Sequence, residues 1–336
     1  MGGGESSAVD ARGLTKVFGA LTAVDGLTLS VAPGEIFGLV GPDGAGKTTT
    51  MRLLTGVMAA TSGAARVLQV DVTRDPEAIR RRIGYVPQSS SLYADLSVLE
   101  NLQFHADLFS VRRAERNRQA TELLAFSKLE PFAKRLAKNL SGGMRQKLAL
   151  CCALIHRPEV LFLDEPTIGV DPVSRRDFWL LIYQLLQQGL TLMVNTPYLD
   201  EAERCHRVGL MDHGRLIACD TPSALRRLLP GTLLELRGPA PEVAAPLLAR
   251  LPEVQETNVF GDALHLIVTD EQTGRARVEA TLQEHGISDV RLRPILAGLE
   301  DVFVTLLRER QPSAAGHQPS AKNEERTEGQ RPMASG

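Results

Sequence analysis

Short apolar runs alternate with segments of helical periodicity through the first 229 residues. Three of these runs are almost wholly apolar, as expected of strands buried on both faces of a parallel sheet, and they cover residues 34–41, 160–166 and 191–196. Residues 48–56 have helical spacing and end on a glycine, which favours a helix stop. A helix-rich segment covers about residues 96–137. The alternation predicts an α/β domain over residues 9–229.

The pattern changes after Pro230 and Gly231. Shorter elements then follow in the order strand, helix, strand, strand, helix, strand, over residues 232–237, 242–251, 254–260, 263–269, 273–285 and 289–294. Gly261 and Asp262 separate the second and third strands and indicate a hairpin turn. The order predicts a small α+β domain of ferredoxin-like type over residues 230–310, which ends in a helix over residues 299–310.

Both ends of the chain are polar. Residues 1–8 predict a flexible leader, and residues 311–336 predict a disordered tail rich in Ser, Gly, Pro and charge.

No stretch approaches the roughly 20 apolar residues of a membrane span, so a membrane role would need a partner. A net charge of -2 gives no reason to expect nucleic acid. The four cysteines match neither a zinc pattern nor a disulfide framework, which indicates a reducing cytoplasm.

The segment GPDGAGKT fits the phosphate-binding pattern G-x-x-x-x-G-K-[ST] at every fixed position. It follows an apolar strand and precedes a helix, so main-chain N–H groups and the positive end of the helix can face phosphates. Lys47 is expected to reach the β- and γ-phosphates of ATP, and Thr48 to bind Mg²⁺. A Gly-rich turn with a chance lysine is the alternative, and it leaves the flanking strand and helix unexplained. The predicted nucleotide-binding residues here are Gly41, Pro42, Asp43, Gly44, Ala45, Gly46, Lys47, Thr48 and Thr49.

A second motif, VLFLDEP, ends a buried strand with two carboxylates. Ligands of open α/β sheets lie at the carboxyl ends of the strands, so this position suits a nucleotide site. Asp164 is expected to hold Mg²⁺, and Glu165 to orient or deprotonate the attacking water. A surface turn with two acids and a proline is the alternative for the motif taken alone.

LSGGM, at residues 140–144, resembles the signature motif of ABC ATPases, and it lies between the phosphate-binding loop and the DE strand as in that family. The resemblance covers about residues 9–229. It implies that Phe18 stacks on adenine, that Gln88 in YVPQ contacts Mg²⁺ and takes part in catalysis, and that Asp171 belongs to the D-loop. It also implies a head-to-tail dimer, in which Ser141, Gly142 and Gly143 of one domain reach the nucleotide of the other. Ser141 is in any case suited to cap the helix that follows.

The finer resemblance is to drug-export and polysaccharide-export ATPases of the daunorubicin-resistance type, and above all to the first ATPase half of tandem exporter proteins. It rests on GPDGAGKTT, YADLSVLENL and LEDVF at residues 299–303. It implies a cytoplasmic subunit of an ABC-2-type export system, held at the inner face of the membrane by a separate permease. A second ATPase domain, identical or different, would complete the dimer. ATP and Mg²⁺ are the implied cofactors.

One position departs from the family pattern. The family has a switch histidine in a Thr-His-x-x-x-Glu-Ala context, whereas this chain reads NTPYLDEAE with Pro197 in place of the histidine. Proline has no side-chain donor and no backbone N–H, so it cannot bind the γ-phosphate as histidine does. Asn195 and Tyr198 are the neighbours that can substitute in part. The sequence therefore predicts a weakened site, with a regulatory subunit that hydrolyses little or no ATP as the alternative.

The predicted tail gives a first test. Residues 311–336 have too little apolar surface to offset the entropy of ordering them. Their deletion is expected to leave the melting temperature and the affinity for ATP unchanged, as measured by calorimetry and by titration with a fluorescent ATP analogue. A clear drop in melting temperature would contradict the prediction.

Overall fold

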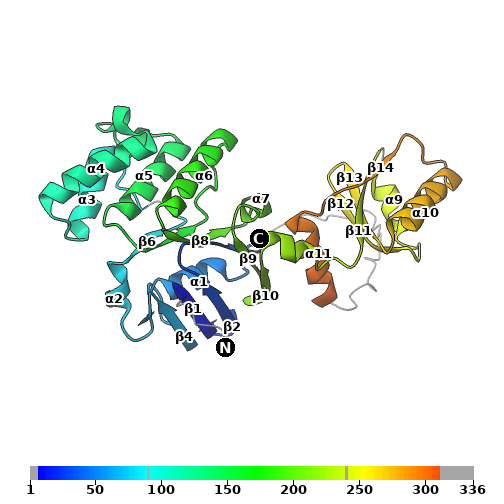
Figure 1. Cartoon of the computed structure of the whole chain (residues 1–336), viewed down its shortest axis with the longest axis horizontal. Helices are drawn as coiled ribbons and strands as arrows, with labels where there is room; N and C mark the ends of the chain where they lie inside the picture. The colour runs from blue at the N-terminus through cyan, green and yellow to red at the C-terminus, as the bar shows by residue number, and fades with distance from the viewer. Residues whose placement is uncertain (1–6, 90, 239–240, 311–336) are drawn as a thin grey trace, which may run out of the picture.

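A six-stranded sheet forms the centre of the larger part of the molecule (Figure 1). The computed structural model describes residues 7–89, 91–238 and 241–310. The strands of this sheet are β3 (Ile36–Val40), β6 (Ile83–Val86), β7 (Val160–Asp164), β8 (Thr191–Thr196), β9 (Arg207–Asp212) and β10 (Arg215–Asp220). Their order is β10-β9-β3-β8-β7-β6, and every neighbouring pair is parallel except β9 and β10. The three apolar runs of the sequence are thus the central strands β3, β8 and β7.

A second, antiparallel sheet covers one face of the first. It consists of β1 (Val9–Phe18), β2 (Leu21–Val31), β4 (Ser62–Val67) and β5 (Val70–Asp71), in the order β2-β1-β4-β5. Helix α1 (Lys47–Leu54) shares one hydrophobic core with both sheets, since Met51 and Leu54 pack in a cluster with Phe37 of β3 and Leu14 of β1. The short helix α2 (Pro76–Arg80) follows β5.

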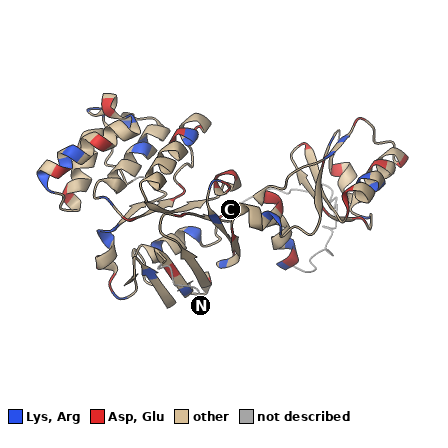
Figure 2. Ribbon diagram, in the orientation of Figure 1, with Lys and Arg blue, Asp and Glu red and all other residues tan. Residues whose placement is uncertain are grey.

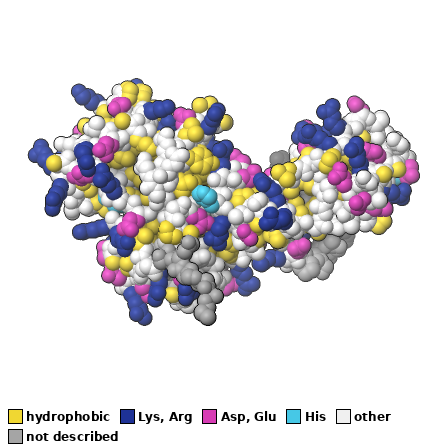
Figure 3. All heavy atoms as spheres, viewed as in Figure 1, with side chains coloured by type: hydrophobic (Ala, Val, Ile, Leu, Met, Phe, Trp, Pro, Cys, Tyr) yellow, Lys and Arg dark blue, Asp and Glu magenta, His cyan; other side chains and the backbone are white. Residues whose placement is uncertain are grey.

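The other side of the six-stranded sheet carries the helices. They are α3 (Val98–Leu108), α4 (Arg113–Ser127), α5 (Gly142–Leu154) and α6 (Pro172–Gln187), followed by the short α7 (Leu199–Ala202) and α8 (Pro222–Arg226). Helix α3 begins with a capping box, in which Ser97 and Glu100 bond each other's backbone N–H. Acidic and basic positions are interspersed on the outer helices (Figure 2), and the same mixture covers the face seen in Figure 3.

The smaller part follows the predicted order of elements. It contains β11 (Thr232–Arg237), α9 (Pro241–Leu248), β12 (Val254–Phe260), β13 (Ala263–Val268), α10 (Glu271–Glu284) and β14 (Arg291–Pro294). The sheet order is β12-β13-β11-β14, and all three neighbouring pairs are antiparallel. Both helices pack on one face of this sheet, where Ala244, Leu248, Val278 and Leu282 meet alternate residues of the strands.

Helix α11 (Leu299–Arg310) joins the two parts. Leu299 and Val302 are fully buried and belong to the core of the larger part, together with Leu225 of α8. On the other side of the helix, Asp301 Oδ1 lies 2.6 Å from His265 Nδ1 of β13. The hydroxyl of Thr305 donates to Glu256 of β12 at 2.9 Å. One face of α11 is therefore apolar and packs on the larger part, and the other is polar and bonds to the small sheet.

The leader predicted over residues 1–8 is partly wrong. Ala8 is buried, its N–H donates to the carbonyl of Val31, and its own carbonyl accepts from Leu68 N–H, each at 2.8 Å. These two bonds extend the β1 ladder back by one residue. The rest of the leader up to residue 6, and the predicted tail, lie outside the described residues. Within the described ranges, no helix is long and apolar enough to cross a membrane.

The apolar face of α11 gives a stability prediction. Leu299 is 1% exposed, so Leu299→Ala is expected to destabilise the protein by about 2–5 kcal/mol through lost burial and an unfilled cavity. Leu296, which is 81% exposed two residues before Gly298, supplies the matched control. Urea unfolding should show a lower midpoint for Leu299→Ala than for Leu296→Ala. Equal midpoints would contradict the docking of α11 on the core.

Candidate nucleotide-binding site

The phosphate-binding loop connects the end of β3 to the start of α1, as the sequence predicts. At two positions of the loop, the neighbouring backbone leaves no room for a side chain, so only glycine fits. A Cβ on Gly41 would lie 2.1 Å from the carbonyl oxygen of Met211, and a Cβ on Gly46 would lie 2.2 Å from that of Ala23. Gly46 also has a φ of 96°, which disfavours any residue with a side chain. The loop is therefore held against β9 and β2 by contacts that only glycine permits.

Lys47 is the first residue of α1 and is only 4% exposed. Its ammonium donates to two carbonyls of the loop itself, those of Gly41 at 2.8 Å and Pro42 at 3.0 Å. Burial lowers the pKa of Lys47, while the nearby charges of Glu165, Asp43 and Asp164 act in the opposite direction. The cation lies within the loop curve, where phosphate oxygens can replace the carbonyls as its acceptors.

Asp164 ends β7 and lies at the centre of a polar cluster. Its Oδ1 accepts from the hydroxyl of Thr48 at 2.9 Å and from the side-chain amide of Asn195, and its Oδ2 accepts from Tyr85 at 3.2 Å. Burial, with the neighbouring charge of Asp164, raises the pKa of Tyr85 to about 12. The Asn195 Oδ1 atom is buried without a hydrogen-bond partner among the described residues. A hydroxyl and a carboxylate in contact are the hard oxygen donors that suit Mg²⁺.

Glu165 follows directly and adopts a left-handed backbone with a φ of 51°. This conformation turns its side chain toward Gln88, whose amide donates to Glu165 Oε2. Its N–H bonds the carbonyl of Asn195 at 2.9 Å, which ties the loop after β7 to β8. Burial raises the pKa of Glu165, and the Lys47 charge partly opposes this shift. A strained, partly desolvated carboxylate beside the phosphate-binding loop has the character of a functional group.

The signature segment lies at the start of α5. Ser141 caps this helix, since its Oγ accepts from Met144 N–H at 3.3 Å. Asp171 caps α6 in the same way by accepting from Ser174 N–H at 2.9 Å. The two helix starts are adjacent, because a Cβ on Gly143 would lie 2.4 Å from the Cβ of Ser174. Two positive helix ends therefore lie side by side, which suits an anion.

The structure groups some predicted residues and separates others. Lys47, Thr48, Gln88, Asp164 and Glu165 form one connected cluster. No hydrogen bond among the described residues joins this cluster to Ser141 or to Asp171. Phe18, at the end of β1, is 45% exposed, with the Lys16 ammonium 5.0 Å from its ring centre. The exposed part of the ring can stack on a planar group.

Tyr85 and Asn195 contribute polar atoms beside Asp164 that the sequence analysis does not assign to the expected Mg²⁺ ligands. The sequence suggests Asn195 only as a partial substitute for the missing histidine, whereas its side-chain amide donates to Asp164. Its position next to Asp164 follows from strand register, since Asp164 pairs with Asn195 across β7 and β8. The period-2 pattern of each strand shows which residues share a face, but register between strands is not a local property of the sequence.

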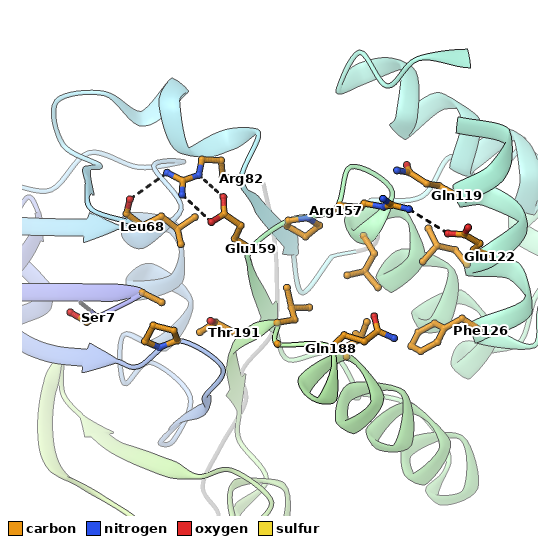
Figure 4. A pocket seen from close by; sticks show the side chains of 18 of the residues that line it. Ser7, Leu68, Arg82, Gln119, Glu122, Phe126, Arg157, Glu159, Gln188 and Thr191 are labelled. Atoms are coloured by element: carbon orange, nitrogen blue, oxygen red, sulfur yellow. Dashed lines mark hydrogen bonds and ion pairs between the residues drawn. The ribbon is translucent and has the colours of Figure 1, made fainter. Parts of the chain in front are cut away.

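A separate cavity lies at the opposite edge of the sheet. It has a volume of about 850 Å³ and is lined by residues at the amino ends of β7 and β8, including Glu159 and Thr191 (Figure 4). Its charges are already paired, Arg82 with Glu159 and Arg157 with Glu122. Because the phosphate-binding loop follows the carboxyl end of β3, this cavity is separate from the candidate site.

Comparisons with known proteins agree with this geometry. A model of the ABC transporter family matches residues 24–168. The Nod factor export ATP-binding protein I of Paraburkholderia xenovorans (strain LB400) is 40% identical over 302 residues, which cover 89% of this chain and 97% of that protein. The chain belongs to the ABC transporter ATP-binding protein family.

Other relatives of this ABC protein extend the comparison. The probable multidrug ABC transporter ATP-binding protein YbhF of Escherichia coli (strain K12) is 40% identical over 88% of this chain and 51% of its own length, so the chain spans about half of that relative. The daunorubicin resistance ATP-binding protein DrrA2 of Streptomyces coeruleorubidus is 38% identical over 89% of this chain and 94% of that protein.

Solved structures confirm the ABC ATPase fold, with its mixed α/β content. A structure of the ATP binding subunit of an ABC transporter superimposes with a TM-score of 0.60 at 29% identity, covering 66% of this chain and 93% of that one. The dimeric ATP-binding cassette MJ0796 in a post-hydrolysis state, bound to ADP and Pi, superimposes with a TM-score of 0.59 at 26% identity, covering 63% and 98%.

Lys47 gives the direct test of the site. Lys47→Ala removes the charge expected to neutralise the phosphates where little water can replace it, so MgATP binding or turnover should fall by at least about 100-fold. Titration with a fluorescent ATP analogue and a phosphate-release assay measure both quantities. Lys134→Ala is the matched control, because Lys134 is an exposed lysine outside the loop. Unchanged affinity together with unchanged turnover would contradict the assignment.

Proposed function

We propose that this ABC protein hydrolyses MgATP and thereby drives export through a separate membrane permease of the ABC-2 type. The observation that carries the proposal is similarity along nearly the whole length of two relatives, named for Nod factor export and daunorubicin resistance. The absence of a membrane-spanning helix among the described residues agrees with a separate permease. In this arrangement the protein lies at the cytoplasmic face of the membrane, held there by the permease, and it exports a drug or another compound.

The residues around Thr48 suit Mg²⁺. Thr48 Oγ1 and Asp164 Oδ1 are 2.9 Å apart, and Gln88 contacts Glu165, the residue that follows Asp164. We propose that Thr48 and Gln88 bind the ion directly and that Asp164 holds it through water. The ion would neutralise charge on the β- and γ-phosphates. Asn195 and Tyr85 orient Asp164 for this role by their hydrogen bonds to it.

Catalysis then falls to a few side chains. Lys47 binds the phosphates, and Glu165 orients or deprotonates the attacking water. The raised pKa of Glu165 favours its action as a base near neutral pH. Gln88 positions Glu165 by donating to Oε2. In a head-to-tail dimer, Ser141, Gly142 and Gly143 of a second ATPase domain would close the site, with Asp171 at the same interface and Phe18 stacked on adenine.

The site is proposed to be a weak one. Pro197 directly follows the last residue of β8. It lies beside the phosphate-binding loop, because Thr196 pairs with Val40, which precedes that loop. The γ-phosphate contact of a switch histidine is therefore missing from this chain. A second ATPase domain that retains the histidine would give one weak and one strong site per dimer. The alternative is a homodimer in which a neighbouring side chain or water does the work of the histidine. The alternative function is a regulatory subunit that binds ATP and hydrolyses little or none.

The small C-terminal part is proposed to be a ferredoxin-like module. Its β-α-β-β-α-β order and its fully antiparallel sheet in the order β12-β13-β11-β14 support this. Because α11 fixes it to α7 and α8, the module is placed to stabilise the ATPase part.

Copurification tests the export function. The full chain should copurify with a polytopic membrane protein of the same organism, and that protein in liposomes should raise its ATPase rate. Lys47→Ala should still copurify but show no stimulation, which separates assembly from turnover. Recovery as a soluble protein alone, with a rate unaffected by any membrane fraction, would contradict the proposal.

The switch position gives a quantitative prediction. Loss of one preorganised transition-state contact costs on the order of 10²–10³ in rate, so the wild-type chain alone should be a slow ATPase. Pro197→His is expected to raise steady-state turnover, measured by phosphate release, with little change in affinity for ADP. Brisk wild-type turnover that the histidine does not raise would contradict the weak-site proposal. Pro197→Ala is the control, because it frees the backbone without adding a donor.

A further inference from the structure

A buried carboxylate lies next to the site without belonging to it. Glu201, on α7, is 0% exposed. A carboxylate taken out of water is costly unless hydrogen bonds and a cation compensate for lost hydration. Its surroundings supply both, and every partner comes from a segment that borders the nucleotide site.

Both oxygens of Glu201 are used. Oε1 accepts from the hydroxyl of Thr167 at 2.5 Å, and Oε2 accepts from that of Thr196 at 2.8 Å. The Thr196 hydroxyl in turn accepts from Tyr198 N–H at 3.1 Å. Both threonines are buried, at 1% and 0% exposure, so water does not compete for these bonds.

Each threonine lies next to a residue of the candidate site along the chain. Thr167 is two residues after Glu165 and precedes the Asp171 cap of α6. Thr196 is the last residue of β8, immediately before Pro197. One carboxylate therefore connects the segment after Glu165 to the segment at the switch position.

Arg175 provides the compensating charge. Its Nε lies 3.6 Å from Glu201 Oε1, and its guanidinium lies 4.4 Å from the ring centre of Tyr198. Arg175 is on α6, one turn after Asp171. The D-loop helix and the loop that carries Pro197 and Tyr198 are thus held by the same ion pair.

We propose that Glu201 is a positioning residue for ATP hydrolysis. It fixes the loop of Pro197 and Tyr198 against the segment that follows Glu165, through Thr196 on one side and Thr167 on the other. The inference rests on the proposed ATPase function. It adds that, where the histidine is missing, the geometry at the γ-phosphate is set by this carboxylate and its two hydroxyl donors.

The test uses variants of the donors, because removing Glu201 would leave the buried hydroxyls of Thr167 and Thr196 without their shared acceptor and endanger folding. Thr167→Val and Thr196→Val keep the shape of the side chain and remove one hydroxyl each. Both are made in the full chain, singly and together, with Thr167→Ser and Thr196→Ser as rescue variants. Asp200→Asn is the control, because Asp200 precedes Glu201 and also faces Arg175, but its side chain is 65% exposed.

Each valine variant is expected to lower kcat by about 10-fold to 100-fold, since small misplacements near a reacting centre have effects of this size. Affinity for ADP should stay within about twofold of wild type. The double variant should be no slower than the slower single variant, because both bonds act through one carboxylate. The serine variants should restore kcat, and Asp200→Asn should match wild type.

Several results would overturn the inference. One is a kcat within about twofold of wild type in both valine variants. Another is a double variant whose fold-loss of kcat equals the product of the two single fold-losses. The third is a fall in ADP affinity as large as the fall in kcat, which would indicate general disruption of the structure. A wild-type chain without any turnover would instead contradict the proposed ATPase function. In that case the ratio of ATP to ADP affinity decides: it falls in both valine variants if Glu201 positions the loop, and an unchanged ratio rejects the inference.

Discussion

The parallel register of β3, β8 and β7 is the constraint on which the site depends. Val40 pairs with Thr196, and Asp164 pairs with Asn195, so three strands end at one level of the sheet. Three segments begin at these strand ends: the phosphate-binding loop, the two carboxylates of VLFLDEP and the segment of Pro197. Residues separated by more than 150 positions in the chain meet there because backbone hydrogen bonds hold the strands in place.

This convergence concentrates charge in a small volume. Asp43, Asp164 and Glu165 all act on the Lys47 ammonium, and Glu165 is itself partly desolvated. An array of fixed charges and dipoles can stabilise a charged ligand without reorganising when it arrives. Hydrogen bonds hold two of these carboxylates in place: Asp164 accepts from Asn195, Thr48 and Tyr85, and Glu165 accepts from Gln88.

The sequence predicts the helices and strands whose ends are marked by nearby residues such as glycine, proline and turn formers. The strand at residues 232–237, the strand at 254–260 and the helix at 299–310 match the structure to the residue. The antiparallel sheet of β1, β2 and β4 was not predicted, because β1 carries polar residues on both faces and irregular pairing with β2 and β4 interrupts its alternation. The residue spacing within GPDGAGKT and VLFLDEP is enough to predict the candidate site. The contacts of Tyr85 and Glu201 depend on how distant strands and helices pack, so the sequence does not predict them.

The placement of α11 has a consequence for how the chain is made. Leu299 and Val302 complete a hydrophobic core whose other members come from the first 229 residues. During synthesis, domains fold as units from the N-terminus onward. Here the nucleotide-binding part cannot close its core until residue 302 has left the ribosome, so a nascent chain that stops at the apparent domain boundary leaves an apolar surface uncovered. Synthesis of the small C-terminal part, which precedes α11 in the chain, must therefore be complete before the core of the larger part can close.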